Sequence, residues 1–248
     1  MVEIVFGELS AVDVFLAIVT GLLGGIVLAF AYKMSAKGSP KWKPRKLVHI
    51  SMGTVIALTV MHYSNLSGPA LAAGIFLTIL LYAWAHKSTL ITELLLAGSR
   101  ESDQRMATFA AGFMGLLAFA LVFIFFFQQP EIFVASILAV SWGDAAGEAI
   151  GRPYGCRFIK KRIKGKSIEG SLGVFAFSCL SVVASLMVFS SGAFWASILP
   201  QIAFVAILVM VIELLSIAWT DNFLIPIVTA IAMWQLIFPT TTFWFLMI

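Results

Sequence analysis

Charge is scarce in this sequence, and cysteine is nearly absent. Only 11% of the 248 residues are Asp, Glu, Lys or Arg, whereas a soluble domain carries about 25%. So few polar side chains cannot cover a water-exposed globule, which argues against a soluble enzyme. The two cysteines, Cys156 and Cys179, lie far apart and form no C-x-x-C pair, so the sequence supports neither a structural disulfide nor a cysteine-based metal site.

Apolar residues, by contrast, make up 61% of the chain and fall into long runs. A bilayer core requires about 20 consecutive apolar residues per helix. We therefore predict an all-α, polytopic membrane helical bundle of about eight transmembrane helices, with residues 1–248 forming a single integral-membrane domain and no soluble domain. The predicted spans are 11–33, 47–63, 68–86, 106–127, 131–151, 168–190, 194–217 and 223–247.

The positive charges predict the orientation of these helices. All 16 Lys and Arg residues lie in three stretches, 33–46, 87–105 and 152–166. Two predicted spans separate each stretch from the next, so all three stretches fall on the same side of the membrane. The connectors near 64–67, 128–130 and 191–193 contain no Lys or Arg. The positive-inside rule places the basic side in the cytoplasm.

Two carboxylates stand near the end of the fifth predicted span, in the sequence SWGDAAGEAIGRPYG. Asp144 and Glu148 are four residues apart, so they share a helix face and can hold one cation between them. Acids inside a span are costly and indicate function. The same stretch has a glycine every fourth residue, a pattern that also suits the packing of a neighbouring helix or a homo-oligomer interface. These glycines are Gly143, Gly147, Gly151 and Gly155.

A basic, glycine-containing stretch follows, GRPYGCRFIKKRIKGKSIEGS, with seven Lys and Arg residues. It ends in Lys166, Glu169 and Gly170, at the predicted start of the sixth span. Glycines and a helix start both favour bound phosphate. The letters GKS do not form a Walker A motif, because Lys160 stands where that motif requires glycine.

Further polar residues are predicted at the same membrane face. Glu213 lies near the inner end of the seventh span, and Asp221 and Asn222 lie in the turn after it. Arg45, Lys46 and His49 begin the second span. Carboxylates, cations and glycine turns that meet at one face suit a magnesium-bound polyphosphate next to a lipid headgroup.

Four stretches together resemble the CTP-dependent lipid kinases, the group of dolichol kinase, phytol kinase and yeast-type diacylglycerol kinase. They are RKLVHISMG, SWGDAAGEAIGRPYG, KGKSIEGS and ELLSIAWTDNFLIP, and the resemblance covers about residues 45–228. It implies transfer of the γ-phosphate of CTP to the hydroxyl of an isoprenoid alcohol or a glycerolipid. The resemblance extends to the Arg-Lys pair (Arg45, Lys46), the Asp and Gly of the nucleotide stretch (Asp144, Gly151), the K-x-x-E-G element (Lys166, Glu169, Gly170) and the D-N pair (Asp221, Asn222).

Roles follow from the residues and the resemblance together. We expect Asp144, Lys166, Asp221 and His49 to be catalytic, with the proton acceptor left open among His49, Glu213 and Asp221. Mg²⁺ is expected on Asp144, Glu148 and Asp221. The nucleotide phosphates are expected to contact Arg45, Lys46, Gly147, Gly151, Gly155, Lys166, Glu169, Gly170 and Asn222.

Three alternatives remain beside an isoprenoid-alcohol kinase. A diacylglycerol kinase differs only in its acceptor, and a CDP-lipid-forming cytidylyltransferase releases pyrophosphate instead of CDP. A transporter usually places its site near the bilayer midplane, within inverted repeats. We expect a nucleoside triphosphate and a membrane lipid alcohol as partners, and no nucleic acid.

Overall fold

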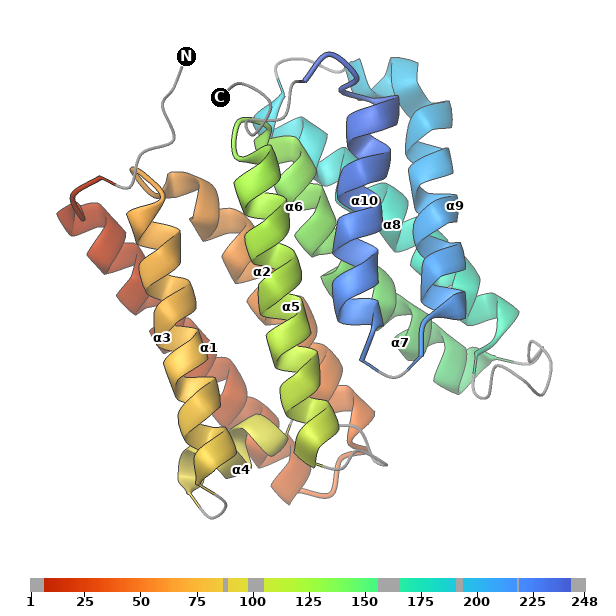
Figure 1. The fold of residues 1–248 in the computed structure, drawn as a ribbon. Coiled ribbons are helices and arrows are strands. Elements are labelled where there is room, and N and C mark those ends of the chain that lie inside the picture. Colours follow the sequence, from red (N-terminus) through yellow and green to blue (C-terminus); the bar gives the residue numbers. More distant parts are fainter. Residues whose placement is uncertain are drawn as a thin grey trace. The chain divides into compact units, whose positions relative to one another are not determined.

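The computed structural model describes residues 7–86, 89–97, 105–155, 166–190, 194–217 and 219–241, and every regular element in these ranges is helical. The predicted all-α membrane bundle is therefore confirmed. The α-helices are α1 (Ala11–Ala36), α2 (Trp42–Thr59), α3 (Ser67–Ala85), α4 (Leu90–Leu96), α5 (Arg105–Phe126), α6 (Pro130–Leu138), α7 (Asp144–Tyr154), α8 (Ile168–Phe189), α9 (Leu199–Leu215) and α10 (Asp221–Leu236) (Figure 1).

The predicted number of eight spans requires correction. Within the described residues, six helices are long and apolar enough to cross a membrane: 11–36, 67–85, 106–126, 130–154, 168–189 and 196–215. The predicted second span falls on α2, whose first turns carry Lys43, Arg45 and Lys46 and so leave too short an apolar run. The predicted eighth span falls on α10, which has only 16 residues and ends at Leu236.

The chain divides into two compact units, Met1–Phe113 and Met114–Ile248. In the first unit, a capping box between Ser10 and Asp13 starts α1. The backbone N–H of Ser64, in the turn before α3, donates to Asp13 Oδ1 at 2.7 Å. At the other end of α1, Ser35 Oγ donates to the carbonyl oxygen of Ala97 at 3.4 Å. The α2 helix, extended by the 3₁₀ turn η1 (Val60–His62), therefore crosses the whole unit, and α3 crosses back.

The second unit contains the most buried rod of the molecule. Pro130, at the first turn of α6, starts a helix that passes through a π-helical segment, η2 (Ala139–Gly143), into α7. This rod packs against α8, and α8 in turn packs against α9. The helix α10 packs on α9, α6 and η2. Figure 1 shows α9 and α10 side by side, joined by a short turn at the end where α7 lies.

Candidate functional site

One apolar cluster fixes the arrangement of four helical segments in the second unit. It consists of the buried residues Ala139 and Val140 of η2, Val174 of α8, Val209 of α9 and Ile225 of α10. Each of the four segments has a polar or glycine residue four positions away from a member of this cluster. These residues are Asp144, Gly170, Glu213 and Asp221.

All four of these residues lie toward the same end of the unit. Contacts pair Gly143 with Ser178 and Gly151 with Ser167, so α7 and α8 run antiparallel. A salt bridge joins the residues just before α8 to the end of α9, and only a short turn separates α9 from α10. The structure thus brings Lys166 and Glu213 together, and the meeting of these two residues with Asp144 and Asp221 in one site stays a prediction. We call this end of the unit, with Asp144, Lys166, Glu213 and Asp221, the polar end.

A lysine and a glutamate form the central ion pair of the polar end. Lys166 Nζ lies 2.7 Å from Glu213 Oε1, and the two side chains are 24% and 11% exposed. Lys166 Nζ also donates to the carbonyl oxygen of Glu213, in the last turn of α9, where the helix dipole favours a cation. An ammonium has three N–H groups. Two are used within the described residues, and one remains for an anionic ligand.

Asp144 stands directly after the π-helical segment and is only 6% exposed. A π-helical turn closes i→i+5 hydrogen bonds and so contains one residue more than an α-helical turn. Such turns occur frequently at functional sites. Here it changes the direction in which all later residues of the rod point. A carboxylate at this depth requires a cation or hydrogen-bond donors, because burying an isolated charge is expensive. Asp144 is therefore a buried acid and not a surface charge, and its role in the reaction stays a prediction.

Asp221 is the first residue of α10 and is 4% exposed. Its Oδ1 accepts a hydrogen bond from the backbone N–H of Asn222 at 2.9 Å. An acid in the first turn of a helix interacts favourably with the helix dipole. The turn before it is held by Thr220, whose Oγ1 accepts from the N–H of Ile217 at 3.0 Å. This short, tied turn holds the D-N pair beside the end of α9.

The glycines of α7 serve the contact with α8. A Cβ placed on Gly147 would lie 2.7 Å from Val174 Cγ2, and one on Gly170 would lie 2.7 Å from the carbonyl oxygen of Gly147. A Cβ on Gly155 would lie 2.7 Å from Ser167 Oγ. The N–H of Gly170 is also engaged, because it donates to Ser167 Oγ at 3.1 Å. Close helix packing thus accounts for Gly147, Gly151, Gly155 and Gly170, and their contact with phosphate stays a prediction.

Magnesium needs fewer protein ligands than most metals. It is commonly held by one or two carboxylates together with substrate phosphates and water. No group of three or more His, Cys, Asp or Glu side chains is placed to hold a metal in the described ranges. The buried carboxylates of Asp144 and Asp221 at the polar end nevertheless suit a phosphate-bound Mg²⁺. Glu148, the third predicted ligand, forms a 2.8 Å salt bridge with Arg152 and is placed less favourably for this role.

The remaining predicted phosphate ligands lie in two other places. Arg45, Lys46 and His49 occupy the first turns of α2 in the first unit, where Lys46 is only 4% exposed. Their participation in the site stays a prediction. The Glu169 side chain is half-buried in the first turn of α8. Five basic residues of the predicted loop lie outside the described residues: Arg157, Lys160, Lys161, Arg162 and Lys164.

Sequence reasoning missed three features of this site. Ser167 is the N-cap of α8, a role that its place before an apolar run with an early Glu169 already indicated. The partner of Lys166 was not predicted, because no sequence signal joins residues 47 positions apart. The π-helical turn has no simple sequence pattern either.

Known proteins similar to this chain are lipid kinases. The chain is 28% identical over 221 residues to the probable phytol kinase 1, chloroplastic, of Glycine max, covering 84% of this chain and 72% of the relative. It is 26% identical to the phytol kinase 1, chloroplastic, of Arabidopsis thaliana, over 85% and 73% of the two chains. It is 27% identical to the CTP-dependent diacylglycerol kinase 1 of Eremothecium gossypii, over 78% and 67%.

No protein-family model matches the chain, and no solved structure matches it. The relatives nevertheless cover most of the chain, and they confirm the resemblance first drawn from the four motifs. The chain is thus a distant homologue of the phytol kinases and CTP-dependent diacylglycerol kinases, at 26–28% identity.

Proposed function

We propose that this chain is a membrane-embedded, CTP-dependent lipid kinase that phosphorylates the hydroxyl of an isoprenoid alcohol at the cytoplasmic membrane face. The observation that carries the proposal is the polar end of the second unit. Buried Asp144 and Asp221 and the Lys166–Glu213 ion pair lie toward that end of the bundle. The names of the relatives supply CTP as the donor and lipid as the acceptor.

The reaction forms one bond and breaks one. The acceptor oxygen bonds to the γ-phosphorus, the bond from that phosphorus to the β–γ bridging oxygen breaks, and CDP leaves. Transition states of phosphoryl transfer are loose, so positioning and charge stabilisation provide most of the catalysis. Lys166, whose third N–H has no acceptor within the described residues, is suited to bind a phosphate oxygen. Glu213 holds that ammonium in place from two sides, through its carboxylate and its carbonyl oxygen.

The carboxylates have a second task. A Mg²⁺ ion carried by the nucleotide would neutralise phosphate charge, and Asp144 and Asp221 are the residues that we assign to hold it. Because Glu213 is committed to Lys166, we assign the hydroxyl proton to Asp221 or His49. Arg45 and Lys46 are proposed to bind the outer phosphate oxygens.

An assay of donors against acceptors tests the proposal. Purified protein in lipid nanodiscs receives γ-labelled CTP, ATP, GTP or UTP together with farnesol, geranylgeraniol, phytol, a long polyprenol or diacylglycerol. We expect labelled phosphate on an isoprenoid alcohol, from CTP, with CDP as co-product. Pyrophosphate as the co-product would instead identify a cytidylyltransferase, and label on diacylglycerol alone would refute the isoprenoid acceptor.

Diacylglycerol remains the second candidate acceptor because two relatives carry that activity in their names. The two acceptors share the chemistry at the hydroxyl and differ in the number of hydrocarbon chains beside it. The polar end alone does not distinguish them. The apolar surface next to the polar end bears on the choice between an isoprenoid alcohol and diacylglycerol.

A further inference from the structure

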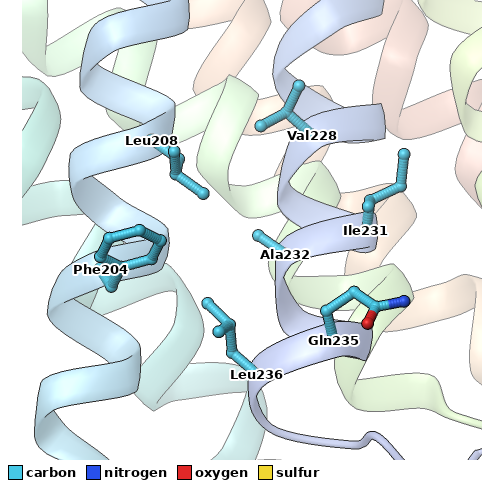
Figure 2. Close-up of a pocket in the computed structure, with 7 residues that line it drawn as sticks. All are labelled: Phe204, Leu208, Val228, Ile231, Ala232, Gln235 and Leu236. Atoms are coloured by element: carbon cyan, nitrogen blue, oxygen red, sulfur yellow. The ribbon is translucent and has the colours of Figure 1, made fainter.

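Two apolar hollows flank α10 in the second unit. The near hollow, with a volume of about 330 Å³, is lined by Met114 and Leu117 of α5 and by Trp219, Thr220, Phe223 and Leu224 around the start of α10. The far hollow, about 280 Å³, lies between α9 and α10, with Phe204 and Leu208 on one side and Val228 and Ile231 on the other (Figure 2).

The near hollow lies between α5 and α10 and the far hollow between α9 and α10, and one stripe of α10 residues lines both hollows. Leu224 lines the near hollow, and Val228, Ile231 and Gln235 line the far one. These residues are spaced by four, three and four positions, so they form one stripe along the helix. Leu224 and Ile231 are 37% and 48% exposed, which places the stripe on the outer surface of the unit. At 1.5 Å per residue the stripe is about 17 Å long.

The near end of this stripe begins at the candidate site. Trp219 and Thr220 directly precede Asp221, and Phe223 and Leu224 directly follow Asn222. The hydroxyl of Thr220 is hydrogen-bonded within its own turn, because it donates to the carbonyl oxygen of Ile217 at 2.9 Å. The near hollow therefore presents hydrocarbon to its occupant. Asp221 itself is 4% exposed and does not line the hollow, so a chain lying there has its polar end next to the turn that carries Asp221.

We propose that the two hollows form one track that binds the hydrocarbon chain of the lipid alcohol, with its hydroxyl next to the turn that carries Asp221. This inference rests on the proposed function. Ligand pockets commonly have volumes of about 300–1,000 Å³. The near hollow lies just above this lower limit and the far hollow just below it, so each holds a segment of one chain, not two chains together. The track therefore suits a single-chain alcohol better than diacylglycerol, and its length makes the far hollow matter only for long chains.

Selectivity between long and short alcohols tests the track. Val228→Trp places an indole in the far hollow, and Leu117→Trp places one in the near hollow. Leu180→Trp is the matched control, because Leu180 is 48% exposed on α8 and lines neither hollow. The measurement is kcat/KM for geranylgeraniol divided by kcat/KM for a short, water-soluble prenol.

We expect V228W to lower this ratio about tenfold, since even one methylene in an apolar pocket changes specificity by that order. L117W should lower kcat/KM for both alcohols, and L180W should leave the ratio unchanged. A V228W ratio equal to the wild-type ratio, or an equal fall in L180W, would overturn the track.

A direct binding measurement separates failure of the track from failure of the kinase proposal. Wild-type protein is photolabelled with a diazirine-bearing isoprenoid alcohol in the absence of nucleotide, and the labelled residues are mapped by mass spectrometry. We expect label on 204–208 and 224–235, displaced by unlabelled alcohol and reduced in V228W. This result supports the track even for a protein that phosphorylates no alcohol.

Label spread over the exposed face of α1, at Phe15, Leu22 and Ile26, and not displaced by unlabelled alcohol would show that bulk membrane lipid covers α10. That result refutes the track and leaves the kinase proposal standing.

Discussion

The α1 helix and the α6–η2–α7 rod have similar lengths but differ in burial, and this difference bears on the role of the buried acid that each contains. The α1 helix and the α6–η2–α7 rod both have the length and composition to cross a bilayer, but 17% of the apolar window is buried in α1 and 78% in the rod. Each carries a buried acid, Asp13 in α1 and Asp144 in the rod. The two acids are satisfied in different ways.

Asp13 has a complete local explanation. It accepts hydrogen bonds from the backbone N–H and the hydroxyl of Ser10 and from the backbone N–H of Ser64. It thus caps its own helix and ties the turn before α3 to it. Asp144 instead follows a π-helical turn and lies one turn from a core that four segments share. Asp13 is therefore a structural acid, whereas Asp144 is the acid that we propose for the chemistry.

The largest expected effect comes from exchanging these two acids for uncharged residues. Asp144→Asn should reduce phosphate transfer by about 10²–10³-fold, the usual loss when a preorganised electrostatic group is removed. Asp13→Asn should lower the apparent melting temperature and leave kcat of the folded protein near that of the wild type. The measurements are transfer from γ-labelled CTP and thermal unfolding in nanodiscs. Equal losses of transfer in both variants would remove the distinction between the two acids.

A double-mutant cycle on Lys166 and Glu213 should give the next largest effect. If Glu213 acts by holding Lys166, then Glu213→Gln lowers kcat/KM in the wild type and has no further effect in Lys166→Ala. The expected coupling is about 0.5–3 kcal/mol, as for residues in one polar network. If the two losses simply add, Glu213 acts independently of Lys166 and returns to the candidates for the proton acceptor.

Removal of divalent metal tests the assignment of the two aspartates. Excess chelator should abolish transfer, and Mg²⁺ should restore it. Asp144→Glu and Asp221→Glu should each raise the Mg²⁺ concentration needed for half-maximal rate, because a longer carboxylate moves the ligand oxygen. The corresponding change at the capping acid, Asp13→Glu, is the control and should leave that concentration unchanged. A metal requirement unaltered in all three variants would contradict the assignment.

Glycine-to-alanine substitutions in the two rods should change the stability of the protein differently, and these are the smallest of the expected effects. A Cβ at Gly147 would lie 2.7 Å from Val174 Cγ2, whereas a Cβ at Gly21 in α1 would meet nothing within 4 Å. Gly147→Ala should destabilise the protein by about 1–3 kcal/mol, as overpacking does. Gly21→Ala should be neutral or stabilising, since alanine favours helix.

Val174→Ala removes the crowding methyl groups and should recover part of the stability lost in Gly147→Ala. Denaturant unfolding of the single and double variants measures this recovery. If Gly147→Ala retains wild-type stability but loses nucleotide binding, Gly147 contacts phosphate as first predicted and does not merely seat α8.

The sequence predicted the positions of the membrane-spanning helices better than it predicted their number. Hydropathy located the spans on α1, α3, α5, α6–α7, α8 and α9 to within a few residues. It overestimated α2, because Arg45 and Lys46 shorten its apolar run, and it continued the last span past Leu236, where α10 ends. Residues 242–247 of that predicted span lie outside the described residues. The charge and the length of an apolar run can be read directly along the sequence, so the positions of the long apolar helices are predictable from it.

For the candidate site, motifs and helix order predict that Asp144, Lys166 and Asp221 act together, and this stays a prediction. The contacts of the site residues could not be predicted from the sequence. The Lys166–Glu213 pair depends on how α8 and α9 pack, and the role of Gly147 depends on which side of α7 faces α8. Such choices follow from side-chain volumes at several helices together, and no local pattern encodes them.

Photolabelling with a CTP analogue that carries its reactive group on the γ-phosphate most directly tests whether the polar end of the second unit is the phosphate-transfer site. The account predicts Mg²⁺-dependent label on peptides that contain 144–155, 166–170 and 213–222, displaced by unlabelled CTP and lost in Asp144→Asn. Displaceable label confined to α1 and α3, or label at the polar end that persists in Asp144→Asn without Mg²⁺, would contradict it.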